Sequence, residues 1–342
     1  MEITTIGGGT GTSAVLDALN DYSDLHINAI ISMMDDGGSN EMVRDQFGLL
    51  PLSDLRKAII SLSKKNKNQL LRKLFTYRFS KGKGVSGHTL GNLIMIAMSD
   101  IAGNEKDAIE KLCELFDTVG KVIPVTYDKV RLIATYENGK VILGEHLIDT
   151  SKISSKIVSL RLSSSALANE KAIHAIANSE YVIIGPGDIY TSIIPNLLVN
   201  GISKELMKTK AKIILISNLM TKKGETDWMK LSDLVSTLEK YIKRRFDIIL
   251  VNNGTIPKNA ITHYKTEKQN ILIDDLPLKS KSVIRSNLVL NEIINKDAGD
   301  TLPRSIVRHD PEKLGKELYS IFRKSDLGFF ARIIRETKGM GI

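Results

Sequence analysis

Four glycines and two threonines between positions 7 and 12 give the chain a segment well suited to holding a phosphate. The run GGGTGT follows an apolar strand at 2–6 and opens a helical pattern. Glycine allows close backbone approach, and the unpaired N–H groups at the start of a helix attract an anion. Thr12 breaks the dinucleotide fingerprint, and no Walker lysine follows. We predict phosphate binding by these residues: Gly8, Gly9, Thr10, Gly11 and Thr12.

Carboxylates follow the second apolar stretch, at 27–33, and open the next helix. Asp35 and Asp36 precede a glycine pair. They could hold ribose hydroxyls, as acidic residues do at this strand end in dinucleotide folds, or Mg²⁺, which prefers oxygen ligands. Asp54 could cap its helix or reach the same metal, and Arg56 could pair with phosphate. The sequence leaves the ribose and metal roles open.

A histidine-containing segment, GHTLGN at 87–92, starts another helix. His88 is a candidate proton carrier or phosphate ligand, and Asn92 is a candidate ligand contact. An isolated histidine is more often a capping or core residue than a catalytic one. We therefore keep Asp36 and His88 as catalytic candidates and assign no catalytic residue.

The second half of the chain repeats the pattern of strand, glycine turn and helix. Apolar strands at 181–184 and 212–217 end in polar or glycine turns, whose predicted ligand contacts are Gly185, Gly187, Asp188, Asn218 and Thr221. Arg308, which lies late in the chain, could give the ligand pocket a charged wall. Ligands of open α/β sheets bind outside the carboxyl ends of the strands, so these turns should share one crevice.

The elements that must position these residues predict an α/β fold: a Rossmann-like, doubly wound, mainly parallel sheet. Strand patterns from about 120 to 163 predict a small antiparallel β insertion, and Asn138-Gly139 within it predicts a type I′ hairpin turn. We predict one domain over 1–324, which includes the insertion, followed by a C-terminal tail over 325–342.

Composition narrows the class of protein. A lone cysteine, Cys113, allows no intrachain disulfide, and we find neither a signal-peptide pattern nor an apolar run long enough to span a membrane. We expect a cytoplasmic protein. The net charge is +9, but the basic residues are scattered among acidic ones. A positive field around an anionic ligand is a better interpretation than nucleic-acid binding.

Several long motifs, in order, resemble the CofD-like superfamily, and within it the gluconeogenesis-factor (YvcK-type) branch. They span nearly the whole chain and are GGGTGTS, DDGGS, PLSDLR, YRF, GHTLGN, GPGDIYTSIIPNLLV, SNLMTKKGETD and RHDPEKL. The resemblance implies a Rossmann-like protein that binds UDP-N-acetylglucosamine, with Tyr264 and Arg308 in contact with the nucleotide sugar. It also implies a role in carbon metabolism, cell-wall supply and cell shape.

Three functions remain after this resemblance. The first is a regulatory protein that senses a nucleotide sugar or another nucleotide diphosphate and signals to a protein partner. The second is a 2-phospho-L-lactate transferase-like enzyme, in which the resemblance implies Mg²⁺ on Asp35, Asp36 and Asp54. The third is a nicotinamide dinucleotide oxidoreductase, which the broken glycine fingerprint disfavours. The sequence leaves open whether the chain forms a homo-oligomer.

Overall fold

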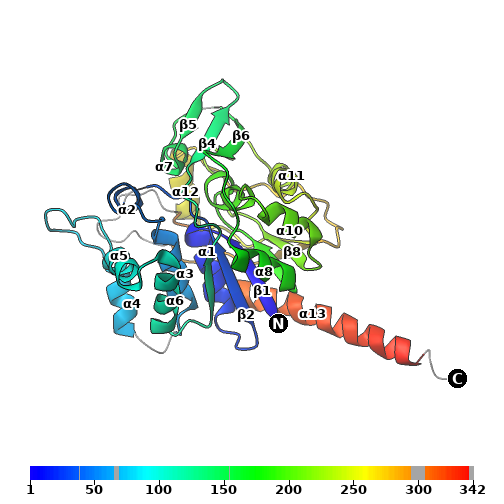
Figure 1. The fold of residues 1–342 in the computed structure, drawn as a ribbon. Coiled ribbons are helices and arrows are strands. Elements are labelled where there is room, and N and C mark those ends of the chain that lie inside the picture. The colour runs from blue at the N-terminus through cyan, green and yellow to red at the C-terminus, as the bar shows by residue number, and fades with distance from the viewer. Residues whose placement is uncertain (38, 65–68, 154, 294–304, 339–342) are drawn as a thin grey trace.

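A seven-stranded parallel sheet forms the centre of the computed structural model, which describes residues 1–37, 39–64, 69–153, 155–293 and 305–338 (Figure 1). The strand order is β10-β9-β8-β7-β1-β2-β3. The bounds are β1 Glu2–Gly7, β2 His26–Ile31, β3 Gly120–Pro124, β7 Tyr181–Ile184, β8 Lys212–Ile216, β9 Ile248–Asn252 and β10 Val283–Ser286. This arrangement confirms the predicted α/β class.

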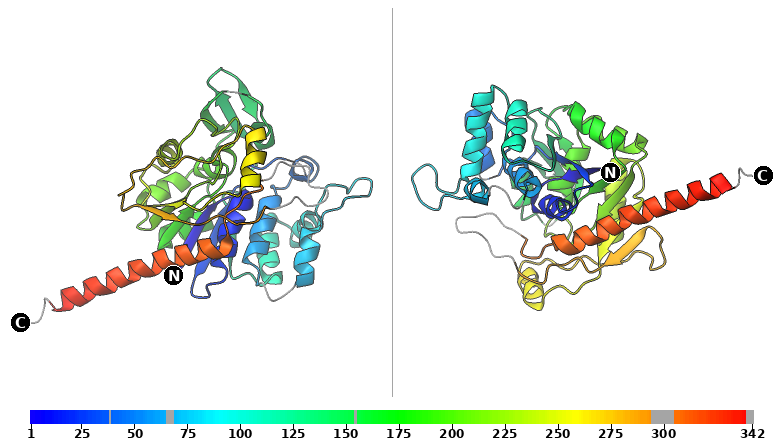
Figure 2. Two further views of the ribbon diagram at one scale, coloured as in Figure 1. Left: turned by 180° about the vertical axis from the view of Figure 1, so that it is seen from behind. Right: turned by 90° about the horizontal axis from the view of Figure 1, so that it is seen from below.

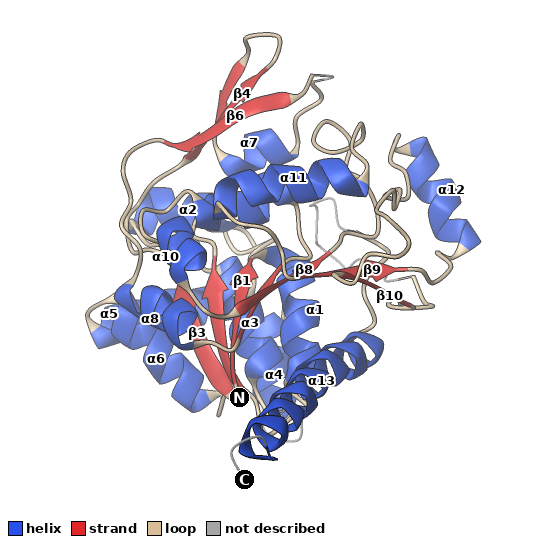
Figure 3. Cartoon of the chain, turned by 90° about the vertical axis from the view of Figure 1, so that its right-hand side faces the viewer, coloured by secondary structure: helices blue, strands red, loops and turns tan. Residues whose placement is uncertain are grey.

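Helices cover both faces of the sheet (Figures 2 and 3). They are α1 Gly9–Leu19, α2 Ser39–Phe47, α3 Ser53–Leu62, α4 Gln69–Thr76, α5 Leu90–Ala102, α6 Glu105–Leu115, α8 Glu170–Asn178, α9 Ile194–Leu197, α10 Ile202–Lys208, α11 Leu231–Ile242, α12 Lys258–Thr266 and α13 Pro311–Lys338, with a π-helical turn, η1, over Ile189–Ile193. All four residues of β7 are buried. A strand covered on both faces must be apolar throughout, which explains its unbroken apolar sequence.

The strand order places a topological switch point between β1 and β7. From β1 the chain moves outward through β2 to β3, and then returns to add β7 on the other side of β1. Loops that leave β1 and β7 at their carboxyl ends therefore run in opposite directions and leave a crevice between them. These are the two glycine turns that the sequence singles out.

The antiparallel insertion is smaller than predicted. It contains β4 Leu132–Tyr136, β5 Val141–Leu143, β6 Ile157–Leu162 and the short helix α7 Glu145–Asp149. β3, expected within the insertion, pairs in parallel with β2 in the main sheet instead. Its last three residues are buried there, so the apolar side chains explain the difference. The insertion lies at the opposite end of the molecule from the N-terminus (Figure 1).

The predicted hairpin is present between β4 and β5, but its turn type differs from the prediction. Gly139 has a φ of 82°, whereas Asn138 is not among the residues with positive φ. A type I′ turn needs positive φ at both central residues, so the prediction of this type is wrong. The Tyr136 N–H donates to the Lys140 carbonyl, which leaves three residues in the loop rather than two.

The predicted boundary between domain and tail falls inside a helix, because α13 continues through residue 324 to Lys338. Its first half packs on α1, where Gly315 permits close approach: a Cβ there would lie 2.6 Å from the Ala18 carbonyl oxygen. The second half extends beyond the rest of the fold (Figure 1). In the part of the chain that the structure describes, no helix is both long and apolar enough to cross a bilayer.

Candidate functional site

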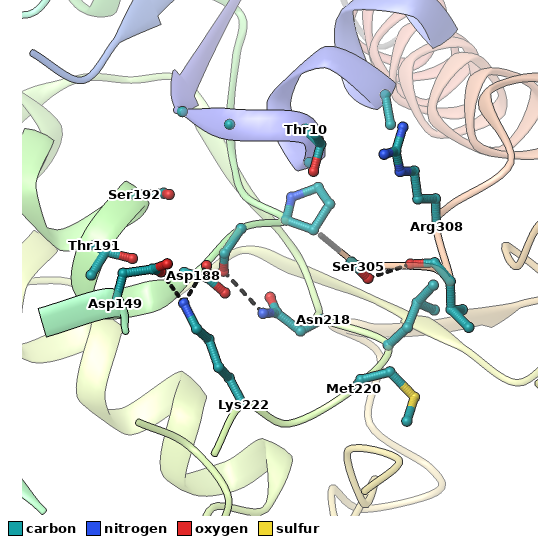
Figure 4. A pocket seen from close by; sticks show the side chains of 18 of the residues that line it. Thr10, Asp149, Asp188, Thr191, Ser192, Asn218, Met220, Lys222, Ser305 and Arg308 are labelled. Carbon is teal, nitrogen blue, oxygen red and sulfur yellow. Dashed lines mark hydrogen bonds and ion pairs between the residues drawn. The ribbon is translucent and has the colours of Figure 1, made fainter. Parts of the chain in front are cut away.

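A cavity of about 260 Å³ opens at the carboxyl ends of β1, β7 and β8, at the switch point of the sheet. Its walls come from both glycine turns, from the starts of α1 and α3, from α7 of the insertion and from the segment before α13. Figure 4 shows side chains from the first glycine turn, α7, the second glycine turn, the end of β8 and the segment before α13 around this cavity. The structure therefore brings together segments that are distant in sequence, as the strand-end argument predicts.

The glycines of the first turn serve different purposes. Gly9 has a φ of 68°, a conformation that L side chains rarely adopt, and it begins α1. A Cβ on Gly11 would lie 2.2 Å from the backbone oxygen of Pro186, so this glycine lets the two turns touch. Gly8, Gly9, Thr10 and Gly11 all line the cavity. The backbone at this point is shaped for close approach by a ligand.

An acidic side chain from α3 accepts a hydrogen bond from one backbone N–H group of this turn. The Gly9 N–H donates to Asp54 Oδ2 at 2.7 Å, and Lys57 Nζ donates to Asp54 Oδ1 at 2.8 Å. A helix N-terminus attracts negative charge through its unpaired N–H groups and its dipole. Asp54 thus places an anion at the start of α1. The predicted cap on its own helix is not present, because Leu52 is the N-cap residue of α3 and no side chain caps it.

The adjacent carboxylates Asp35 and Asp36 point to different places. Asp35 lines the cavity and accepts from the Gly37 N–H at 2.9 Å. Burial, together with the nearby Asp54 carboxylate, raises the pKa of Asp35 to about 6. Asp36 instead accepts from the His146 N–H at 2.8 Å and so stabilises the start of α7. Asp36 is not among the residues that line the cavity, so its expected ligand contact stays a prediction.

The three carboxylates proposed for Mg²⁺ are consequently engaged in different interactions. Asp36 holds α7, and Asp54 holds the Gly9 amide and Lys57. Within the described residues, no group of three or more His, Cys, Asp or Glu side chains is arranged to hold a metal ion. The donor set therefore does not fit the magnesium site that the resemblance implies, and we derive no chemical step through a metal.

Other predicted contacts lie outside the cavity. Arg56 Nε donates to Asn92 Oδ1 at 3.0 Å, which ties α3 to α5 in a buried contact. Thr12 is buried and its hydroxyl donates to the Gly8 carbonyl. His88 lies just before α5, and Gly185 directly follows β7. None of these five residues, Arg56, Asn92, Thr12, His88 and Gly185, lines the cavity.

The second glycine turn contributes Gly187 and Asp188 to the cavity, as predicted. Gly185 has a φ of 75° and is followed by a cis peptide bond to Pro186. Asn218 Nδ2 donates to the Gly187 carbonyl at 2.9 Å and so fixes the turn against the end of β8. Asp188 is paired with a lysine that the sequence prediction did not include.

That residue is Lys222, which follows Thr221 on the cavity wall. Its ammonium group contacts carboxylates from three segments, on Asp149, Asp188 and Glu225 (Figure 4 shows the first two). The carboxylates raise the pKa of Lys222 well above its ordinary value, against the opposing effect of burial. The Lys-Lys pair within SNLMTKKGETD was the available sequence signal; its partner on α7 comes from far away in the chain.

The residues assigned by resemblance come from two segments: Arg308 from the segment before α13 and Tyr264 from α12. Arg308 points into the cavity in Figure 4, and Tyr264 also lines it. The Tyr264 hydroxyl accepts from the Ile306 N–H at 3.0 Å and the Val307 N–H at 3.3 Å. Tyr264 therefore positions the segment that carries Arg308, in addition to lining the cavity.

The contact between the two glycine turns gives a direct prediction. Gly11→Ala should lower the free energy of unfolding by about 2 kcal/mol, a typical cost of overpacking, because its Cβ meets backbone rather than a flexible side chain. Urea unfolding measures the difference. Gly187→Ala is the matched control, since its Cβ would lie 3.6 Å from the nearest atom. Equal stability of the two variants would contradict the contact.

Comparisons with known proteins identify the family of the chain. The family model described as "2-phospho-L-lactate transferase CofD" matches residues 3–289. The "Gluconeogenesis factor" of Bacillus subtilis is 34% identical over 328 residues, covering 94% of this chain and 98% of that protein. A second protein named as a gluconeogenesis factor, from Thermotoga maritima, is 36% identical over 323 residues. That match covers 94% of this chain and 100% of the relative.

A solved structure extends the likeness to three dimensions. A Bacillus halodurans protein, described as a member of the upf0052 family, superposes with a TM-score of 0.82 and 31% identity, covering 92% of this chain and 97% of that one. The family model covers the cavity segments up to β10, and the match to the Thermotoga maritima protein extends over 94% of the chain. The chain belongs to the 2-phospho-L-lactate transferase CofD family, within its group of gluconeogenesis factors.

Proposed function

We propose that the protein binds the nucleotide sugar UDP-N-acetylglucosamine in this cavity and acts as a cytoplasmic regulatory protein. Its role, as a gluconeogenesis factor, links carbon metabolism to cell-wall supply and cell shape. One observation carries the binding proposal: the Gly9 amide, at the start of α1 and at the switch point of the sheet, already binds a carboxylate that a ligand phosphate would replace.

The other walls suit the remaining parts of such a ligand. Lys57, Lys222 and Arg308 place three cationic side chains around the cavity, which suits a diphosphate. Hydroxyl groups of Thr10, Thr191, Ser192 and Ser305 also line it and can pair with sugar hydroxyls. The cavity thus has separate surfaces for an anionic and a polyhydroxylated part of one molecule.

The transferase named by the family model is the second candidate. If the protein is an enzyme, the family match supports this transferase activity. Asp36 is one of the acidic residues that the transferase would need as a Mg²⁺ ligand. In the structure it accepts from the His146 N–H and stabilises α7. We therefore prefer binding and regulation. Any Mg²⁺-dependent turnover that Asp36→Asn abolishes, without loss of folded protein, would favour the enzyme.

Thermal-shift measurements test the binding proposal directly. UDP-N-acetylglucosamine should raise the melting temperature with or without Mg²⁺, because a ligand that binds only the folded state stabilises it by mass action. GDP and NAD serve as competing probes. No shift with the UDP sugar at saturating concentration, or a larger shift with NAD, would reject the proposal.

Arg308 gives the proposal a residue-level test. Arg308→Gln should weaken UDP-N-acetylglucosamine binding about tenfold, since a hydrogen bond to a charged group contributes about 1.5 kcal/mol. Calorimetric titration measures the affinity. Arg323→Gln is the matched control, because Arg323 pairs with Asp24 on the surface away from the cavity. Equal affinity in all three proteins would remove Arg308 from the binding surface.

A further inference from the structure

Lys222 connects the cavity to the antiparallel insertion. Its Nζ lies 2.8 Å from Asp188 Oδ2, in the second glycine turn, and 2.8 Å from Glu225 Oε1. It also donates a hydrogen bond to Asp149, the last residue of α7. Figure 4 shows its side chain reaching across the cavity wall toward Asp149 and Asp188. One ammonium group thus joins the insertion to the main sheet.

The three carboxylates do not hold Lys222 equally. Glu225 is buried, and its Oε1 is the only one of its two carboxylate oxygens that the described ion pair with Lys222 engages. Burial raises the pKa of Glu225 to about 8 although Lys222 opposes the shift, so Glu225 is the weakest anionic partner of the three. The charge on Lys222 is then shared between Asp149 and Asp188, whose side chains are partly exposed to the cavity.

An anionic ligand would enter this arrangement as a competitor. A diphosphate carries more negative charge than one carboxylate and presents several acceptor oxygens, so it can draw a lysine from an existing pair. Asp149 is the partner whose loss has a structural consequence, because it lies on α7. The other end of α7 is held by Asp36, and the helix packs against η1.

We propose that Lys222 is a ligand-responsive latch. Without ligand it holds α7 through Asp149; with a nucleoside diphosphate bound, it pairs with phosphate and releases Asp149, so that α7 and the insertion shift. The identity of the ligand rests on the proposed function, whereas the latch itself rests on the contacts of Lys222. The insertion is the element that moves. Its surface therefore differs between the ligand-free and the ligand-bound protein, and a partner can distinguish the two states.

The chain contains its own reporter for this movement. Trp228 is the single tryptophan, and it lies on the same segment as Lys222. The ammonium group of Lys156, next to the start of β6 in the insertion, lies 4.4 Å from the centroid of the Trp228 ring. A shift of the insertion relative to this segment changes the cation–π contact, and with it the tryptophan emission.

Tryptophan emission, measured with UDP-N-acetylglucosamine, UDP and uridine, tests the latch. Wild-type emission should change with the two diphosphates and not with uridine. Asp149→Asn should show the changed emission without ligand and bind UDP several-fold more tightly, because Lys222 has lost a competing carboxylate. Lys222→Gln should also show the changed emission without ligand, and bind UDP about tenfold more weakly. Lys156→Gln gives the emission expected when the ring loses its cation.

Lys223→Gln is the matched control, since Lys223 is the exposed neighbour of Lys222 and does not line the cavity. It should match the wild type in emission and affinity. If UDP raises the melting temperature but the emission of wild type, Asp149→Asn and Lys222→Gln is the same, the latch is overturned while the binding proposal stands. If no diphosphate binds, the binding proposal fails, and the ligand-free emission of the two variants still decides whether the latch holds the insertion.

Discussion

Asp54→Asn should bind UDP-N-acetylglucosamine about a hundredfold more tightly than the wild type. In the structure, the Asp54 carboxylate occupies the Gly9 amide and neutralises Lys57. A phosphate that binds the same amide must approach this charge. Two charges about 5 Å apart, at an effective dielectric constant of about 20, repel by about 3 kcal/mol. Asparagine removes the charge, keeps an acceptor for the Gly9 N–H and frees Lys57 for the ligand.

Calorimetric titration without and with Mg²⁺ measures this effect. Asp117→Asn is a suitable control, because it removes an exposed carboxylate that pairs with Lys64 and does not line the cavity. Its affinity should equal that of the wild type. A loss of affinity in Asp54→Asn, confined to titrations that contain Mg²⁺, would show instead that Asp54 is a metal ligand and would favour the transferase.

Glu225→Gln should remove a large part of the dependence of stability on pH. Burial raises the pKa of Glu225 from 4.5 to about 8, so the folded protein retains a proton that the unfolded chain releases. Its contribution is complete below the unfolded pKa and is lost as the pH rises toward the folded one. Between pH 5 and 8 the loss is about 3 kcal/mol, at 1.36 kcal/mol for each pKa unit. Glutamine stays neutral and avoids this loss.

Urea unfolding at pH 5, 6, 7 and 8 measures the difference between the two proteins. The variant and wild type should have similar free energies of unfolding at pH 5, and the variant should be the more stable at pH 8. Asp227→Asn is the control, since this exposed carboxylate lies two residues further along the same segment. A constant difference between Glu225→Gln and wild type at every pH would contradict the assignment of the proton to Glu225.

The parallel sheet and its two glycine turns could be predicted because both depend on local pattern. Unbroken apolar runs indicate strands covered on both faces, and the turn that follows each run must lie at one edge of a parallel sheet. Gly8, Gly11 and Gly187 were found in this way. Even so, the sequence could not separate the glycine that touches Pro186, Gly11, from one that tolerates a side chain, Gly187.

The side chains outside the turns were harder to place. Asp35 and Asp36 are adjacent, yet one faces the cavity and the other stabilises α7, because the destination of α7 depends on tertiary packing. Arg56 has the charge expected of a phosphate ligand but serves a buried contact with Asn92. The pairing of Lys222 with Asp149 joins residues 73 positions apart, for which a single sequence offers no local signal.

The structure of the complex with UDP-N-acetylglucosamine tests the central claim most directly. The diphosphate should lie against the start of α1, with the Gly9 N–H donating to a phosphate oxygen in place of Asp54, and with Arg308 against the nucleotide sugar. A diphosphate bound elsewhere on the protein, or a Gly9 N–H that still donates to Asp54 in the saturated complex, would contradict the account.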